Sequence, residues 1–230
     1  MDERPDRVVD DPWWMFLWAT VGTTFRLALK LRVEGVEHIP AEGPAILAAN
    51  HVSPIDPIAM GLAASQRGRT VRFLTAAESF DIPFVGWGLR RLRQIPIRRG
   101  TRDLAAIQDA ANLIAGGALA GIYPEGELGP GDALLPAKKG MARLALAAEA
   151  PVVPAGMWGM QRRWPAGGIR LGLPLRPVAA VVIGEPVPAE GDPSNDDDVR
   201  VLTDRVMASI ATLMERARAI AFQGETSTSE

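Results

Sequence analysis

The residues whose types and spacing point most directly to chemistry are a histidine and an aspartate five positions apart, His51 and Asp56. Both stand in the stretch Asn50-His51-Val52-Ser53-Pro54-Ile55-Asp56, between two apolar segments. A histidine beside a carboxylate suits general-base catalysis, because the carboxylate orients the imidazole while the other ring nitrogen accepts a proton. The His-x4-Asp spacing therefore predicts a base, His51, and its orienting acid, Asp56.

The same residues allow a purely structural interpretation. Ser53 and Asp56 form a Ser-x-x-Asp pattern, the capping box, in which the acid only accepts backbone N–H groups at the start of a helix. Ser53 would then be the N-cap, with Pro54 at the first helical position. From this window alone, the catalytic and the structural interpretation both stay open.

The elements that must position the pair are a strand and a helix. Residues 45–49 are apolar throughout and predict a short buried strand, and residues 58–64 predict the helix. Further strands are expected at 31–36, 70–75, 95–97, 119–123, 152–157 and once or twice within 169–183. Further helices are expected at 83–93, 103–115, 138–150 and from a cap at Ser194 to about Phe222. This alternation predicts an α/β fold with a mixed, largely parallel central sheet flanked by helices.

Length and composition limit the function classes. The 230 residues predict one main domain at 32–222, after an acidic leader and interfacial helix at 1–31 and before a disordered tail at 223–230. A net charge of −2 argues against general nucleic-acid binding, yet nine arginines within 67–102 predict an anion-facing surface. With no cysteine and two histidines, the chain offers no thiolate nucleophile, no disulfide and no multi-histidine metal centre.

The N-terminal region combines tryptophans with scattered charges. Residues 1–11 are acidic, unlike a secretory signal, and half of the six tryptophans fall within six residues at 13–18. Arg26 and Lys30 flank this cluster, as expected for an amphipathic helix that lies in a membrane interface. A buried packing helix is an equal alternative, and a membrane-spanning helix fits less well because Gly22 and the charges interrupt the apolar run.

Residues 50–56 also resemble the first sequence block of the glycerolipid acyltransferases, of the lysophosphatidic acid acyltransferase type. Three further blocks of that family have counterparts in the same order. They are Ile95-Pro96-Ile97-Arg98-Arg99, Tyr123-Pro124-Glu125-Gly126 and Ala150-Pro151-Val152-Val153-Pro154-Ala155, with Lys138-Lys139-Gly140 before the last. The chain is identified as a member of this family over about residues 33–157.

The resemblance implies transfer of a fatty acyl group from acyl-CoA or acyl carrier protein to the hydroxyl of a lysophospholipid. The implied acceptor is 1-acylglycerol 3-phosphate, which would give phosphatidic acid. In that scheme His51 is the base and Asp56 fixes its tautomer, with no acyl-enzyme, metal or further cofactor. The implied acceptor-binding residues are Arg98, Arg99, Glu125 and Gly126. The enzyme would be peripheral or monotopic at the cytoplasmic face of the cell membrane.

Three features, at four positions, depart from the family pattern. Glu127 and Leu128 stand where the family usually has Thr-Arg, Arg98 replaces an acid, and Ala76 stands where a lysine is frequent. Two expected cations are thus missing and one is gained, so the acceptor stays open. The alternatives are a different polar lipid or glycolipid as acceptor, a hydrolase with the same base, and a non-catalytic lipid-binding module. Candidates for an acyl groove are Trp87, Leu89, Leu92 and the helix from Met141, together with the N-terminal tryptophan cluster.

Overall fold

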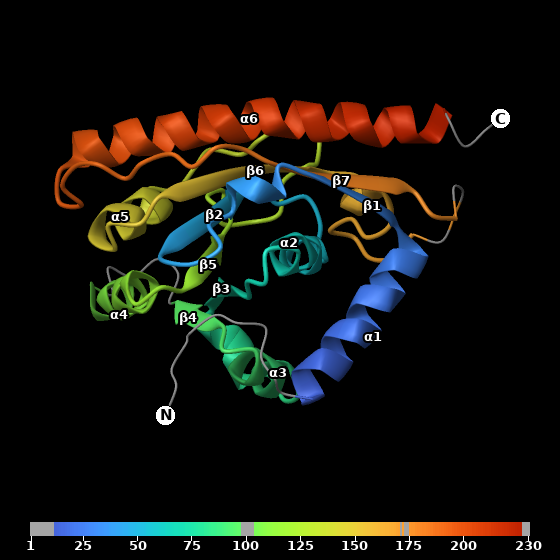
Figure 1. The fold of residues 1–230 in the computed structure, drawn as a ribbon, viewed down its shortest axis with the longest axis horizontal. Helices are drawn as coiled ribbons and strands as arrows, with labels where there is room; N and C mark the ends of the chain where they lie inside the picture. The colour runs from blue at the N-terminus through green and yellow to red at the C-terminus, as the bar shows by residue number, and fades with distance from the viewer. Residues whose placement is uncertain (1–11, 98–103, 171, 173–174, 227–230) are drawn as a thin grey trace.

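The framework is a seven-stranded sheet, seen in a computed structural model that describes residues 12–97, 104–170, 172 and 175–226 (Figure 1). Its strands are β1 (Lys30–Glu34), β2 (Ala45–Ala49), β3 (Val71–Ala76), β4 (Ile95–Ile97), β5 (Leu119–Ile122), β6 (Val152–Trp158) and β7 (Val178–Ile183). Their order is β1-β7-β6-β2-β5-β3-β4, and all neighbours are parallel except β6 and β7. The predicted mixed, largely parallel sheet is confirmed.

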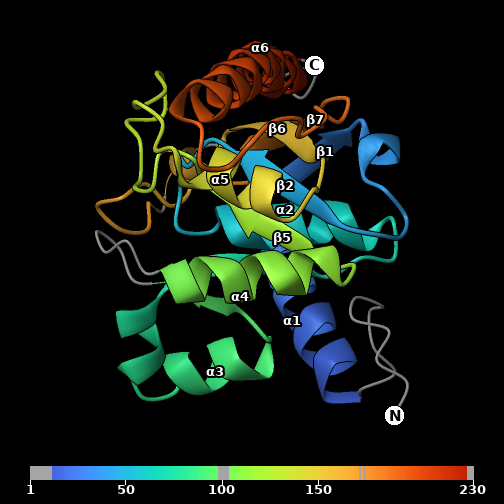
Figure 2. The same ribbon diagram turned by 90° about the vertical axis from the view of Figure 1, so that its left-hand side faces the viewer.

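Helices cover both faces of this sheet. They are α1 (Pro12–Ala28), α2 (Asp56–Ser65), α3 (Val85–Arg91), α4 (Leu104–Ala115), α5 (Gly140–Ala147) and α6 (Asp196–Thr226). Side chains alternate between the two faces of a strand. Accordingly, Leu47 of β2 packs in the cluster that contains α1 and α2, whereas Ile46 packs with α4, α5 and α6. Figure 2 shows the resulting layers, with α6 at one end of the molecule and α1 and α3 at the other.

Strand β2 lies near the middle of the sheet, between β6 and β5. All of its residues are buried, as are all those of β6, which is typical of parallel strands that helices cover on both faces. Because β6, β2 and β5 are parallel, their carboxyl ends meet at one edge of the sheet. Segments that follow these strands therefore converge there, which is where open α/β sheets bind ligands.

Two helix starts differ from the prediction. Helix α2 begins at Asp56 with Ile55 as its N-cap, so Ser53 does not cap it. The Ser53 hydroxyl instead donates a hydrogen bond to the carbonyl of Trp164, a distant loop residue that the local pattern does not reveal. Helix α6 is capped by Asn195 rather than Ser194, because the Asn195 side chain accepts the N–H of Asp197.

Three other predicted elements have different limits. Helix α6 continues to Thr226, beyond the end expected near Phe222, so residues 223–226 are helical rather than disordered. Helix α5 is shorter than the predicted span 138–150. The region 169–183 contributes one strand, β7, within its described residues. The leader 1–11 and the last residues 227–230 lie outside the described part of the chain.

Helix α1 packs against the domain along its carboxyl-terminal half. Phe25 and Leu29 are buried in the core, and a Cβ placed on Gly22 would lie 3.2 Å from the Leu62 side chain of α2. The packing role considered from the sequence therefore applies to this half, whereas the tryptophan side chains lie outside what the structure describes. Among the described residues, no helix combines the length and the apolar character that crossing a bilayer requires.

The predicted basic surface is smaller than the arginine count suggests. Arg69 is buried and donates to the carbonyls of Pro40, Gly43 and Gly117, where it joins three loops. Arg72 is buried as well. Of the nine arginines, those at 90, 91 and 93 are exposed around the end of α3. Sequence counting could not separate these exposed cations from structural ones.

Candidate active site

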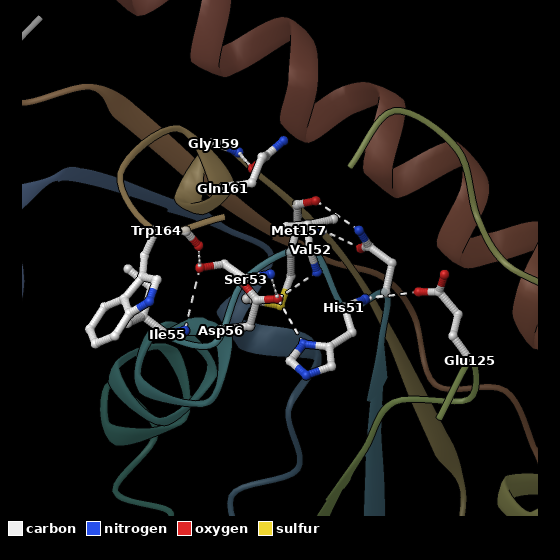
Figure 3. A network of polar contacts seen from close by, with 11 residues as sticks. His51, Val52, Ser53, Ile55, Asp56, Glu125, Met157, Gly159, Gln161 and Trp164 are labelled. Atoms are coloured by element: carbon white, nitrogen blue, oxygen red, sulfur yellow. Dashed lines mark hydrogen bonds and ion pairs between the residues drawn. The ribbon is translucent and has the colours of Figure 1, made fainter. Parts of the chain in front are cut away.

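His51 and Asp56 meet just beyond the carboxyl end of β2. The His51 Nδ1 atom lies 3.0 Å from Asp56 Oδ2, within hydrogen-bonding distance (Figure 3). The Asp56 side chain is fully buried, whereas the His51 side chain is 18% exposed. The second ring nitrogen of His51 points away from this network in Figure 3. The imidazole thus has one nitrogen fixed by a carboxylate and the other turned away from it.

Asp56 combines the two roles that the sequence left open. Its Oδ2 atom also accepts the backbone N–H groups of Val52 and Ser53, at 2.7 and 2.8 Å. Burial raises the pKa of Asp56, and the hydrogen bonds from His51 and the two amides oppose that rise. The capping contacts therefore hold the carboxylate in place, and the same oxygen orients the imidazole.

The backbone of His51 is fixed by the loop that follows β5. The His51 N–H donates to Glu125 Oε1 at 2.8 Å, and its carbonyl accepts the N–H of Gly129 at 2.7 Å. The other carboxylate oxygen of Glu125 accepts the N–H of Leu135 at 2.6 Å. Glu125 is 1% exposed, and this burial raises its pKa. The structure therefore places Glu125 behind His51, where it joins two loops, and its predicted contact with an acceptor stays a prediction.

Tyr123 holds the imidazole from one side. The two rings stack at 4.0 Å between centroids, and Phe73 of β3 lies parallel to Tyr123 at 6.0 Å. Phe73 reaches this place because Gly121 has no side chain: a Cβ there would lie 2.5 Å from the Phe73 ring. Burial and the charge of Asp56 raise the pKa of Tyr123 well above its usual value, so its hydroxyl stays neutral.

Two residues of the site were not assigned roles from the sequence. The first is Asn50, whose side-chain amide donates to the backbone carbonyl of Met157 and accepts its backbone N–H. The amide thus continues the hydrogen bonding between β2 and β6 beyond the end of β2. The second is Tyr123, which was noted only as part of the segment Tyr123-Pro124-Glu125-Gly126. Its stacking on His51 depends on the pairing of β2 with β5. An Asn next to the His, and an aromatic residue directly after a buried strand, were the available signals for these two.

An apolar cavity of about 280 Å³ adjoins the site, between α2, β3 and α3. Pro57 and Ile58 form part of its wall and directly follow Asp56. Phe73, which stacks on Tyr123, forms another part. Of the sequence candidates for an acyl groove, Leu89 and Leu92 line this cavity, whereas Trp87 is exposed and Met141 is buried in the core on the other face of the sheet.

Gly126 lies in the same loop with a lysine close to it. It has φ of +72°, a conformation that favours glycine, and a Cβ placed there would be 2.7 Å from Lys138 Nζ. The backbone N–H of Lys138 also donates to the carbonyl of Pro124 at 2.8 Å. Lys138 thus brings a positive charge next to Gly126, at the loop where Leu128 replaces the arginine of the family pattern.

The predicted acceptor-binding arginines, Arg98 and Arg99, lie outside the described residues. Ile97, the last described residue before them, ends β4. Strand β4 stands three positions from β2 in the sheet order, which corresponds to about 14 Å between the backbones of β2 and β4. The structure therefore brings together His51, Asp56, Glu125 and Gly126, and leaves the arginine pair as a prediction.

Comparison with known proteins gives consistent matches. Residues 30–158 match the family model described as Acyltransferase. The chain is 28% identical to an uncharacterized protein of Mycobacterium tuberculosis over 84% of its own length and 63% of that protein. It is 26% identical to 1-acyl-sn-glycerol-3-phosphate acyltransferase of Bacillus subtilis, over 68% of this chain and 73% of that one. The chain thus spans about three fifths of the mycobacterial relative.

A solved structure has the same fold. It is the 1-acyl-sn-glycerophosphate (LPA) acyltransferase PlsC from Thermotoga maritima, with a TM-score of 0.66 and 24% sequence identity. The similarity covers 86% of this chain and 78% of that one. At this identity, the match supports the architecture of sheet and helices.

Proposed function

Because the chain belongs to the acyltransferase family, we propose that it moves a fatty acyl group from a thioester donor to the hydroxyl of a lipid acceptor. The observation that carries this proposal is the His51–Asp56 pair, in which the carboxylate engages one imidazole nitrogen, together with the apolar cavity whose wall begins at Pro57. Such a pair would serve no purpose in a module that only binds lipid.

In the proposed reaction His51 is the general base. Its free nitrogen takes the proton of the acceptor hydroxyl as the oxygen attacks the thioester carbonyl carbon. The carbon–sulfur bond then breaks, and the leaving thiolate takes the proton from the imidazolium. Asp56 stabilises the imidazolium and keeps Nδ1 protonated in the resting state. No covalent enzyme intermediate is required, in keeping with the lack of cysteine.

The proposed acceptor is a lysophospholipid with a phosphate head group, most directly 1-acylglycerol 3-phosphate. Support comes from the names of the Bacillus subtilis and Thermotoga maritima relatives and from the cation beside Gly126. Lys138 would bind the phosphate in place of the missing arginine of the third block. Arg98 and Arg99 would add to this charge, and Glu127, which is exposed, would turn away from it.

The cavity beside Asp56 is proposed to hold an acyl chain. Its wall is apolar and it borders the stack of Phe73, Tyr123 and His51, so a chain there would end near the base. The donor would be acyl-CoA or acyl carrier protein. The enzyme would attach to the cytoplasmic face of the cell membrane through α1, as a peripheral or monotopic protein.

The test is an acyl-transfer assay with purified protein and oleoyl-CoA. Lysophosphatidic acid, glycerol 3-phosphate, a zwitterionic lysophospholipid and a phosphate-free lipid alcohol are supplied in parallel, and both thiol release and acylated product are followed. We expect product with lysophosphatidic acid. If product formed only with one of the other lipids, we would assign the change of acceptor specificity to Glu127-Leu128. Thiol release without acylated product would favour a hydrolase. If neither thiol release nor product were detected, a binding module would be the remaining interpretation.

A further inference from the structure

The connection after β3 exposes a group of large apolar side chains. A 3₁₀ turn at Ala77–Asp81 leads into α3, and Ile82, Phe84, Val85 and Trp87 are all exposed around its start. We call these four residues the apolar tip. Phe84 is 89% exposed and Trp87 is 60% exposed. Neighbouring exposed apolar residues of this size mark an interaction surface on a folded protein.

The backbone holds the apolar tip outward. Phe84 has φ of +62°, and the N–H of Val85 donates to the carbonyl of Pro83 at 2.7 Å, which closes a strained γ-turn at Phe84. Behind this γ-turn, α3 packs closely on the 3₁₀ turn. A Cβ on Gly86 would lie only 1.9 Å from the carbonyl of Phe80, so the two segments can approach this closely only because residue 86 is glycine. The Phe84 ring is therefore presented to solvent by a tightly packed support.

The exposed charges around the apolar tip are Glu78 and Asp81 before it and three arginines after it, and this positive excess indicates its partner. Arg90 and Arg91 are exposed in the last turn of α3, about two helical turns from Phe84, and Arg93 is exposed two residues after the helix. Aromatic residues beside exposed arginines match the interface of an anionic bilayer, where rings enter the headgroup level and the cations meet lipid phosphates. We propose that the apolar tip inserts into an anionic membrane surface.

Two features of the fold agree with this occupant. In Figures 1 and 2, α3 and α1 both lie at the end of the molecule opposite α6, so one bilayer would meet both helices. Leu89 of α3 and Leu92, which directly follows that helix, also line the apolar cavity. Insertion of the tip would bring the cavity next to the lipid from which an acyl chain enters. The inference concerns surface chemistry and does not depend on the acyl-transfer reaction.

The absence of cysteine from the sequence allows a direct test. Phe84→Cys is labelled with an environment-sensitive fluorophore, and Val201→Cys, at an exposed position of α6, is the matched control. Vesicles of phosphatidylcholine with and without phosphatidylglycerol are then added. We expect a blue shift at position 84 that requires phosphatidylglycerol and weakens with salt, and no shift at position 201.

A second measurement uses the unlabelled protein. Phe84→Ser/Trp87→Ser should lower binding to phosphatidylglycerol vesicles by about tenfold or more, whereas Val201→Ser should not. Activity on monodisperse, water-soluble substrates should be unchanged, which separates this result from failure of the proposed reaction. A label at 84 that stays in water while the protein binds vesicles would overturn the proposal. A shift that follows protein concentration without vesicles would assign the tip to self-association, and equal shifts with both vesicle types would remove the role of anionic lipid.

Discussion

The connections that follow β2 and β3 leave the same edge of the sheet, yet they break the usual burial rule in opposite directions. After β2, three polar residues are buried: Asn50, Ser53 and Asp56. After β3, the apolar tip is exposed. Polar residues are ordinarily exposed and large apolar ones ordinarily buried, so both exceptions call for a reason beyond packing. The buried polar group fits chemistry, and the exposed apolar group fits a surface that the protein meets.

The difference also lies in how each connection is held. His51 is fixed by a ring hydrogen bond, two backbone hydrogen bonds and a stacked ring, from residues on two separate segments, the start of α2 and the connection after β5. The apolar tip is held by its own local turn and by α3. Proton transfer requires that the His51 ring be held in a defined position, whereas insertion into lipid requires only that apolar side chains be exposed. Changes in the first connection should therefore affect the rate, and changes in the second should affect membrane binding.

The largest effect is expected from His51→Ala. Loss of the base should lower acyl transfer by about 10³-fold or more, while the fold remains, because the side chain is partly exposed. His38→Ala is the matched control, since His38 lies between β1 and β2, away from His51 along the chain, and contacts the carbonyl of Ile183. Steady-state kinetics and circular dichroism measure the two effects. Near-normal activity of His51→Ala, or equal losses in both variants, would contradict the assigned role.

A combined loss of stability and rate is expected from Glu125→Gln. The carboxylate accepts two backbone N–H groups, and an amide can accept only one of them while its NH₂ group opposes the other. We expect the free energy of unfolding to fall by about 1–3 kcal/mol and the rate to fall with it. Urea unfolding of Glu125→Gln is compared with Glu127→Gln, two residues away and exposed. If the two variants had equal stability, Glu125 would not support His51.

The pKa shifts predict that acid removes activity before it unfolds the protein. Burial raises the pKa values of Asp56 and Glu125 in the folded protein. The protonation of these two carboxyls therefore adds most to the free energy of unfolding below the ordinary carboxyl pKa range, and this addition is lost as pH rises through the raised pKa values. Acidification therefore favours the fold at these two sites, while protonated Asp56 no longer stabilises the imidazolium. Parallel profiles of kcat/KM and Tm against pH measure this. Coincident loss of both would contradict it.

Much of the β2 connection could be predicted from the sequence because its determinants are local. The apolar run of β2, the His-x4-Asp spacing and the helix after it lie within about twenty residues. What could not be predicted depends on residues brought together by the sheet. The Glu125 contact with His51 joins positions 74 residues apart, and the Ser53 contact with Trp164 joins positions 111 apart. A local capping pattern could not show that the Ser53 hydroxyl is taken elsewhere.

The apolar tip shows the opposite limit of sequence reasoning. Trp87 was a candidate for an acyl groove because an acyl chain needs apolar side chains beside the base, and the sequence could not show which of Trp87, Leu89 and Leu92 face a cavity. The structure places the two leucines on the cavity and Trp87 outside. Gly86 approaches the Phe80 carbonyl closely, so this side of α3 faces the preceding 3₁₀ turn. Burial of a single side chain follows from such packing and not from its type.

A moderate effect on substrate binding is expected from Lys138→Ala. Removal of the cation beside Gly126 should raise the KM for a phosphate-bearing acceptor by about tenfold and leave the KM for the acyl donor unchanged. Lys139→Ala is a matched control, since Lys139 instead forms an ion pair with Asp196 at 3.6 Å. Equal effects of the two variants, or an equal rise in both KM values, would argue against an acceptor role for Lys138.

The smallest effect is expected from Tyr123→Phe, which tests whether every buried polar group near His51 serves chemistry. The substitution keeps the stacked ring and removes a hydroxyl that has no hydrogen-bond partner among the described residues. Since an unpaired buried hydroxyl is unfavourable, the free energy of unfolding should rise slightly and kcat should change little. Tyr123→Leu, which loses the stacking, should lower kcat more. If Tyr123→Phe lowers kcat as much as Tyr123→Leu does, the hydroxyl acts on the reacting atoms. The buried polar residues that serve the reaction would then include one that follows β5, in addition to those that follow β2.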